Sequence, residues 1–275
     1  MKDPQPIIVN HLFAGVLDSL VELLASLDSG QWSRPTSCSK WSVKDVALHL
    51  LGGEVGILSR QRDAHLIGPS VQSWDQLVAL INDLNSLWVE ATRRISPRLL
   101  CDLLKHTGEQ SCEYFSSLDP FAIGGPVDWA GPERAPVWLD IAREYTERWH
   151  HQQQIRDAVA RPGLKEPRFL APVLDTFVRA LPHTYRRVGA EEGTIVQLTI
   201  TGESGGEWFI RREAKRWKLY VGQSNSPSSE VTVDQEDAWR LFTRGLSSET
   251  ASARIAISGD KDLARHAVGM VSVIA

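Results

Sequence analysis

The sequence predicts a protein of the class α + (α+β), in which an N-terminal four-helix bundle precedes a smaller α+β domain. Three observations support this class. The chain has 275 residues, and two domains of ordinary size are more usual at this length than one. Segments with helical periodicity fill the part before residue 165, and short β-branched runs follow it. The stretch "ARPGLKEPR", residues 160–168, predicts a linker because its prolines interrupt a helix. We therefore expect domains at 1–160 and 168–275.

The first domain is expected to be helical throughout. Four segments have the periodicity of helices, at residues 7–28, 42–62, 74–95 and 135–159. Long helices joined by loops are typical of an antiparallel four-helix bundle, whose core often holds a metal site built from facing helices. The connection before the last helix is rich in glycine and proline, "DPFAIGGPVDWAGPERAP", and indicates a loop.

The second predicted helix carries a histidine on its inward face. Ser42 followed by Asp45 matches a capping box and marks the start of this helix. Helical spacing then places His49, Gly52 and Gly53 on one inward stripe. A glycine inside a helix costs about 0.5–1 kcal/mol relative to alanine, so a packing or functional reason is expected. Here the two glycines would clear space beside the imidazole for an ion with its water or substrate.

The second domain is expected to be α+β. Its β-branched runs are "GTIVQLTITG", "EWFIRR", "RWKLYVG", "SEVTV" and "ARIAIS". The alternation in "TIVQLTI" predicts a sheet with one buried face that helices cover. Such a sheet forms an ordinary α+β core as readily as a lipid tunnel.

Charge and hydropathy exclude several classes of partner. The net charge is −4, which gives no general attraction to nucleic acid or to anionic lipid. The N-terminus carries an acid and two prolines where a signal peptide needs a basic start and an apolar run, and no window approaches the roughly 18 apolar residues of a membrane span. We expect a cytoplasmic protein that binds neither nucleic acid nor membrane.

The three cysteines, Cys38, Cys101 and Cys112, are odd in number and widely spaced, and none forms a C-x-x-C pair. This pattern supports neither a disulfide framework nor a cysteine zinc site. We expect each of them to be a plain small residue rather than a nucleophile.

A set of two histidines and one glutamate suggests a metal site. Glu147 and His151 lie four residues apart, so one face of a helix carries both. Alone, this pair fits a solvated helix face as well as a metal site, and a lone His49 is more often a hydrogen-bonded core or boundary histidine than a ligand. Together the three side chains suit zinc or another divalent first-row metal, with one coordination position left for water or substrate.

Two stretches resemble the ligand helices of a known family. "CSKWSVKDVALHLLGGE" and "REYTERWHHQQQIRDAV" resemble those of the DinB-like proteins, in particular the mycothiol-dependent maleylpyruvate isomerase family. The resemblance implies a DinB-like bundle with the metal ligands His49, Glu147 and His151, and it places His150 at a variable position. Relatives often carry aspartate three residues after the ligand histidine, where this chain has Gln154.

The tail also matches this family. "SEVTVDQEDAWRLFTRG" and "ARIAISGDKDLARHAV" resemble strand-then-helix units of its C-terminal domain, which is similar to sterol carrier protein 2. In the family an arginine of this domain lies near the site, where it could pair with a substrate carboxylate. Four residues of the tail are candidates: Arg211, Arg212, Arg244 and Arg254. The last two are preferred, although each also fits a solvated charge at the end of an element.

The resemblance implies a metal-dependent enzyme. Its cofactors would be a divalent metal, zinc with nickel as the alternative, and a low-molecular-weight thiol such as mycothiol. The reaction would be cis/trans isomerisation or thiol transfer on a small electrophilic substrate. The sequence assigns no catalytic residue, specific substrate or oligomeric state. A non-catalytic carrier of lipids or other hydrophobic ligands, with a metal-stabilised helical domain, is the alternative function.

Overall fold

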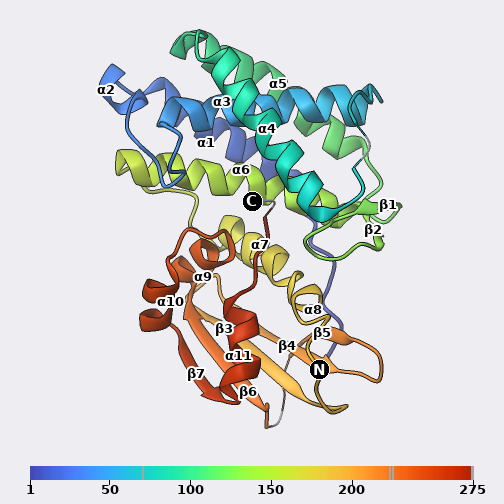
Figure 1. The fold of residues 1–275 in the computed structure, drawn as a ribbon. Helices are drawn as coiled ribbons and strands as arrows, with labels where there is room; N and C mark the ends of the chain where they lie inside the picture. The colour runs from blue at the N-terminus through green and yellow to red at the C-terminus, as the bar shows by residue number, and fades with distance from the viewer. Residues whose placement is uncertain (70, 223, 225, 274–275) are drawn as a thin grey trace. The chain divides into compact units, whose positions relative to one another are not determined.

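The computed structural model of the chain describes residues 1–69, 71–222, 224 and 226–273 (Figure 1). The chain forms two compact units. The helical unit comprises residues 8–120 and 144–164, and the α+β unit comprises residues 1–7, 121–143 and the described chain from Lys165 onward. The division passes through the expected linker, but it also assigns residues 121–143 to the α+β unit. The domain bounds 1–160 and 168–275 remain a prediction.

Six α-helices form most of the helical unit, and the last of them begins in the α+β unit, before residue 144. They are α1 (Phe13–Ala25), α2 (Ser29–Trp32), α3 (Val43–Gly56), α4 (Trp74–Thr92), α5 (Pro97–Ser117) and α6 (Val137–Val159). A 3-10 turn precedes α1, and a π-helical segment, Ile57–Arg62, continues α3. The predicted capping box of Ser42 and Asp45 is confirmed at the start of α3. Among the described helices, none has the length and apolar composition needed to cross a membrane.

The predicted bundle is confirmed as a class, but one of its members differs from the prediction. The interior lies among α1, α3, α5 and α6, and α5 was not predicted. Its buried stripe combines Leu100, Leu104 and Phe115 with the small residues Gly108 and Ser111, so the sequence did carry an apolar pattern for this helix. Gly108 has a packing reason, because a Cβ there would lie 2.6 Å from Leu17 Cδ1 of α1. Helix α4 packs on α3, which it crosses in Figure 1. Val89 is its fully buried residue.

A buried ion-pair network joins α6 to α3. The Nε and Nη2 atoms of Arg148 donate to the two carboxylate oxygens of Glu54, each at 2.8 Å, and Nη1 donates to Glu144 at 2.8 Å. The guanidinium also lies over the rings of Phe13 and Phe115. Burial alone would lower the pKa of Arg148, but the two carboxylates hold it above its usual value. The interior of the bundle therefore contains a permanent positive charge that its neighbours fully neutralise.

The α+β unit contains seven strands and five further helices within the described residues. They are β1 (Ile123–Pro126), β2 (Arg134–Pro136), α7 (Pro167–Val178), α8 (Leu181–Thr184), β3 (Ile195–Thr201), β4 (Gly206–Arg212), β5 (Trp217–Val221), β6 (Ser229–Asp234), α9 (Gln235–Phe242), α10 (Ser248–Arg254), β7 (Ala256–Gly259) and α11 (Lys261–Val268). The main sheet has the order β5-β4-β3-β6-β7, in which β3 and β6 are parallel and the other neighbours antiparallel. Strands β1 and β2 form a separate hairpin.

One face of the main sheet is covered by helices, as the alternation predicts. Val196, Leu198 and Ile200 of β3 are buried on this face. Trp208 pairs with Leu198 on the neighbouring strand, and its indole donates to Asp175 of α7 at 2.9 Å. The α+β class is confirmed. One prediction was wrong in detail, because Arg254 ends α10 and the last strand begins only at residue 256.

Replacing Arg148 with methionine should destabilise the bundle strongly. The change keeps much of the side-chain volume but leaves the buried carboxylate of Glu54 without its bidentate partner. The free energy of unfolding should fall by about 3–5 kcal/mol. Urea denaturation followed by circular dichroism measures this. Arg62→Met is the control, because Arg62 forms an exposed ion pair with Asp63, and it should change stability little. Similar losses in both variants would contradict the role assigned to the buried network.

Candidate metal centre

The three predicted ligands come together between α3 and α6. Glu147 and His151 lie one turn apart on α6, and α3 brings His49 opposite them. Glu147 Oε1 is 3.1 Å from His49 Nε2 and 3.0 Å from His151 Nε2. One ligand atom from each residue lies within 4.8 Å of the others. The spacing predicted for Glu147 and His151 therefore produces a shared point with a histidine 98 residues away in sequence.

The donor set fits a divalent metal ion. Zinc binds imidazole nitrogen and carboxylate oxygen at about 2.0–2.2 Å, which places neighbouring donors of a tetrahedral site about 3.3–3.5 Å apart. The observed separations of 3.0 and 3.1 Å are close to this value, so small movements would admit an ion. The two imidazole rings stand edge to face, with centroids 4.6 Å apart. Three protein donors leave one position of a tetrahedral ion open to an external ligand.

The exposure of the three side chains differs. The side chains of His49 and His151 are 11% exposed, whereas that of Glu147 is 37% exposed. The carboxylate is therefore the most exposed part of the donor set. Two nearly buried imidazoles and one accessible carboxylate resemble the open sites at which metals do chemistry rather than closed structural sites.

The electrostatics of the site centre on Glu147. Burial lowers the pKa of His49, and the charge of His151 lowers it further. Burial opposes the charge on His151 as well, but the carboxylate of Glu147 and its hydrogen bond raise the pKa of His151 to about 10. Burial would raise the pKa of Glu147, yet the charge and hydrogen bonds of the two histidines hold it well below its usual value. At neutral pH without metal, His49 is neutral and His151 shares a proton with Glu147.

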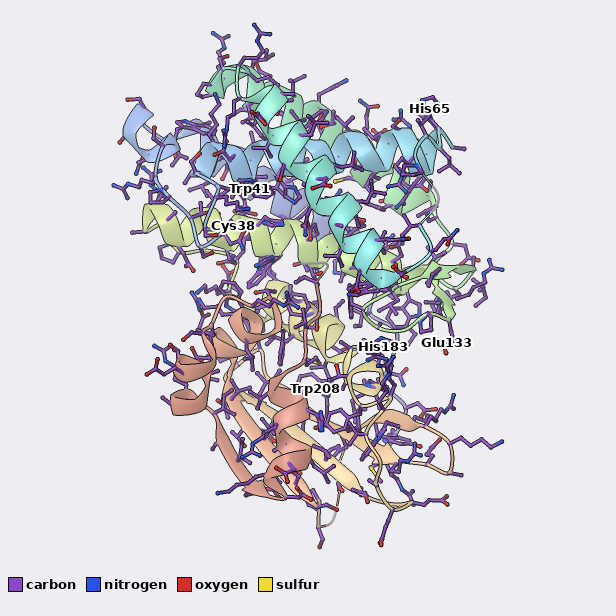
Figure 2. The ribbon with its side chains drawn as sticks, in the orientation of Figure 1. Cys38, Trp41, His65, Glu133, His183 and Trp208 are labelled. Atoms are coloured by element: carbon purple, nitrogen blue, oxygen red, sulfur yellow. The ribbon has the colours of Figure 1, made fainter. Side chains whose placement is uncertain are left out.

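Side chains outside the donor set hold the ligands in place. Gln154 Oε1 lies 2.7 Å from His151 Nδ1, and Cys38 Sγ donates to the same oxygen at 3.1 Å. The ring of Trp41 packs against His49 with centroids 4.9 Å apart. Figure 2 shows Cys38 and Trp41 between the ribbons of α3 and α6. Position 154 departs from the family pattern in the sequence, but its contact with Cys38 could not be predicted, because Cys38 lies on a loop.

The interpretation of the two glycines needs correction. A Cβ at Gly52 would lie 2.8 Å from Cδ1 and Nε1 of Trp88, whose indole donates to the carbonyl of Leu48. Gly52 therefore accommodates a tryptophan of α4 rather than an ion beside His49. Gly53 is exposed, so it does not lie on the inward stripe, and a Cβ there would meet no atom within 4 Å.

The remaining candidates lie elsewhere. Arg211 and Arg212 belong to β4, Arg244 follows α9, and Arg254 pairs with Asp237 at 2.7 Å, all within the α+β unit. A role for any of them at the metal centre stays a prediction. Cys101 and Cys112 carry free thiols whose pKa values burial raises, that of Cys112 to about 11, so both are protonated at neutral pH.

The comparison with protein families gives a match to the helical part. The sequence profile of the mycothiol maleylpyruvate isomerase N-terminal domain matches residues 13–156, more than half of the chain. The chain therefore belongs to the mycothiol maleylpyruvate isomerase family. All three candidate ligands lie within the matched residues. No curated protein matches the chain.

Solved structures with a similar fold include a mycothiol-dependent maleylpyruvate isomerase, at 13% identity and a TM-score of 0.55, covering 90% of this chain and 91% of that one. A histidine-to-alanine mutant of such an isomerase gives the same identity and coverage with a TM-score of 0.49. Sterol carrier protein 2 like 2 from Aedes aegypti matches at 26% identity over 36% of this chain and 95% of that one, with a TM-score of 0.29. The first of these matches shows a shared fold.

The two glycines of α3 provide a matched pair of variants. Gly52→Ala should lower the free energy of unfolding by about 1–3 kcal/mol, because the new methyl group displaces Trp88. Gly53→Ala meets open space and should raise stability by about 0.5–1 kcal/mol through the better helix propensity of alanine. Thermal and urea denaturation of both variants measure the difference. Stabilisation by Gly52→Ala would contradict the assigned packing role.

Proposed function

We propose that this member of the mycothiol maleylpyruvate isomerase family is a divalent-metal-dependent enzyme that uses a low-molecular-weight thiol on a small electrophilic substrate. The observation that carries the proposal is the convergence of His49, Glu147 and His151 on one point with an accessible side. Two imidazoles and a carboxylate favour zinc, and nickel accepts the same donors. The similar structure of a mycothiol-dependent isomerase supports a thiol as the second cofactor.

The chemistry of the site follows from its charge. A divalent ion held by the three donors would lower the pKa of a bound thiol and supply a thiolate at neutral pH. The thiolate sulfur can add to one carbon of a conjugated double bond, which becomes a single bond about which the substrate rotates. Expulsion of the same sulfur restores the double bond in the other geometry, with the thiol regenerated. If the sulfur instead stays attached and the neighbouring carbon takes up a proton, the outcome is thiol transfer.

The protein residues would supply orientation and protection. His49 and His151 are almost buried, so the donors stand in fixed positions before any ligand arrives. The ring of Trp41 covers His49 and limits the approach of water from that side. Access therefore remains beside Glu147, where thiol and substrate would enter.

Metal analysis tests the ligand set directly. Protein purified without chelator or histidine tag should carry about one zinc or nickel ion per chain, because catalytic zinc sites typically have three protein ligands. His49→Ala and His151→Ala should lose the ion, as measured by elemental analysis. His150→Ala is the matched control and should retain it, since His150 lies outside the donor set. Equal loss in all three variants would show that the donor set is wrong.

Metal binding should release a proton. His151 shares its proton with Glu147 in the metal-free site and has a raised pKa of about 10, whereas His49 is already neutral at pH 7. An ion that takes His151 Nε2 must displace that proton, so affinity should rise about tenfold per pH unit between pH 7 and 9. Titration calorimetry in buffers of different ionisation enthalpy measures the release, expected to be about one proton per ion. A pH-independent affinity would contradict the assigned protonation.

Turnover assays test the reaction. Metal-loaded protein should act on an electrophile such as maleylpyruvate only when a thiol is present, with mycothiol and glutathione as the first thiols. A thiol needed but not consumed indicates isomerisation, and a thiol consumed indicates transfer. Chelation and His151→Ala should abolish both. Absence of metal-dependent turnover with every thiol, together with a co-purified acyl chain in native mass spectrometry, would favour the hydrophobic-ligand carrier instead.

A further inference from the structure

Gln154 connects one candidate ligand to two neighbouring side chains. It is 7% exposed and lies on α6, three residues after His151. Its Oε1 is 2.7 Å from His151 Nδ1 and 3.1 Å from Cys38 Sγ, and its Nε2 is 3.0 Å from His150 Nε2. One amide group therefore contacts three side chains, two of them through the same oxygen.

The hydrogen-bond donors and acceptors around Gln154 are compatible with only one orientation of its side-chain amide. His151 Nε2 faces Glu147, an acceptor-only carboxylate, and it is also the atom that points to the shared ligand position. Nδ1 is then the nitrogen that must keep its hydrogen when Nε2 binds an ion, and it needs an acceptor. The amide oxygen provides this acceptor, and its second lone pair takes the Cys38 thiol hydrogen. A flipped amide would set an N–H donor against the Nδ1–H donor.

We infer that Gln154 is a positioning residue that fixes the orientation of the His151 imidazole, keeps hydrogen on Nδ1 and directs Nε2 to the point shared with His49 and Glu147. The inference deepens the proposed function and rests on it for the identity of the bound group. Partners of the remote nitrogen of a ligand histidine orient the ring and raise its basicity. A neutral amide would do so here without adding charge.

The chain offers a restoring variant and a matched control. Gln154→Leu removes both polar atoms and keeps most of the volume, whereas Gln154→Glu keeps an acceptor oxygen for Nδ1. Gln152 lies on the same helix and is fully buried, and its amide has no hydrogen-bond partner among the described residues. Gln152→Leu therefore makes the same chemical change without touching a candidate ligand.

The first measurement uses metal-free protein. Nitrogen-15 NMR of the histidine side chains should show a slowly exchanging Nδ1–H signal for His151, assigned by its loss in His151→Ala. The signal should persist in Gln152→Leu and Gln154→Glu and disappear in Gln154→Leu through fast exchange with water. Circular dichroism verifies that each variant is folded. A signal that survives in Gln154→Leu, or is lost equally in Gln152→Leu, would overturn the inference. If Gln154→Leu does not fold, failure of Gln154→Glu to retain the signal overturns it.

The second measurement is the affinity for cobalt or zinc by chelator competition, with the cobalt absorption spectrum as a report on ligand geometry. Gln154→Leu should bind about 10- to 100-fold more weakly with an altered spectrum, and Gln154→Glu should recover both. Unchanged affinity in Gln154→Leu would overturn the positioning role. If the wild-type chain binds no metal while its Nδ1–H signal depends on Gln154, the proposed function fails and the orientation of His151 by Gln154 stands.

Discussion

The ion pair between Arg148 and Glu54 holds α6 against α3, and the candidate metal centre depends on the separation of these two helices. Glu147 directly precedes Arg148 on α6, and His49 lies five residues before Glu54 on α3. The pair is bidentate and buried, so it fixes the relative angle of the two helices as well as their distance. The stability of the bundle interior and the geometry of the ligand set therefore rest on the same contact.

Around the shared ligand position, each imidazole has a second contact that restricts its rotation. The ring of Trp41 packs on His49, and Gln154 accepts from His151 Nδ1. The Nε2 atoms of both imidazoles also lie within hydrogen-bond distance of the same oxygen, Oε1 of Glu147. Ligands held in this way on helices keep their positions when the ion is absent, because rigid elements and not loops carry them. The accessible carboxylate is then the part of the site that is free to respond to an incoming ligand.

Features that depend on helical periodicity could be predicted from the sequence. The convergence of Glu147 and His151 follows from their spacing of four, which needs no knowledge of the rest of the chain. Helix α5 was missed although its inward face carries Leu100, Leu104 and Phe115 at helical spacing. What local patterns do not show is the close approach of Gly108 to Leu17 of α1. The pairing of Arg148 with Glu54 joins residues 94 apart, and local patterns carry no information about such contacts. Tertiary packing decided these features.

Glutamine at position 154 also determines the net charge around a bound ion. Neutral His49 and His151 with the carboxylate of Glu147 would leave a divalent cation with one excess positive charge, which a thiolate then neutralises. An aspartate in place of Gln154 would add a negative charge beside His151 and make the thiolate-bound site anionic, whereas the amide adds none. The amide of Gln154 therefore contacts His151 Nδ1 while leaving the charge balance between the ion, its three donors and a thiolate unchanged.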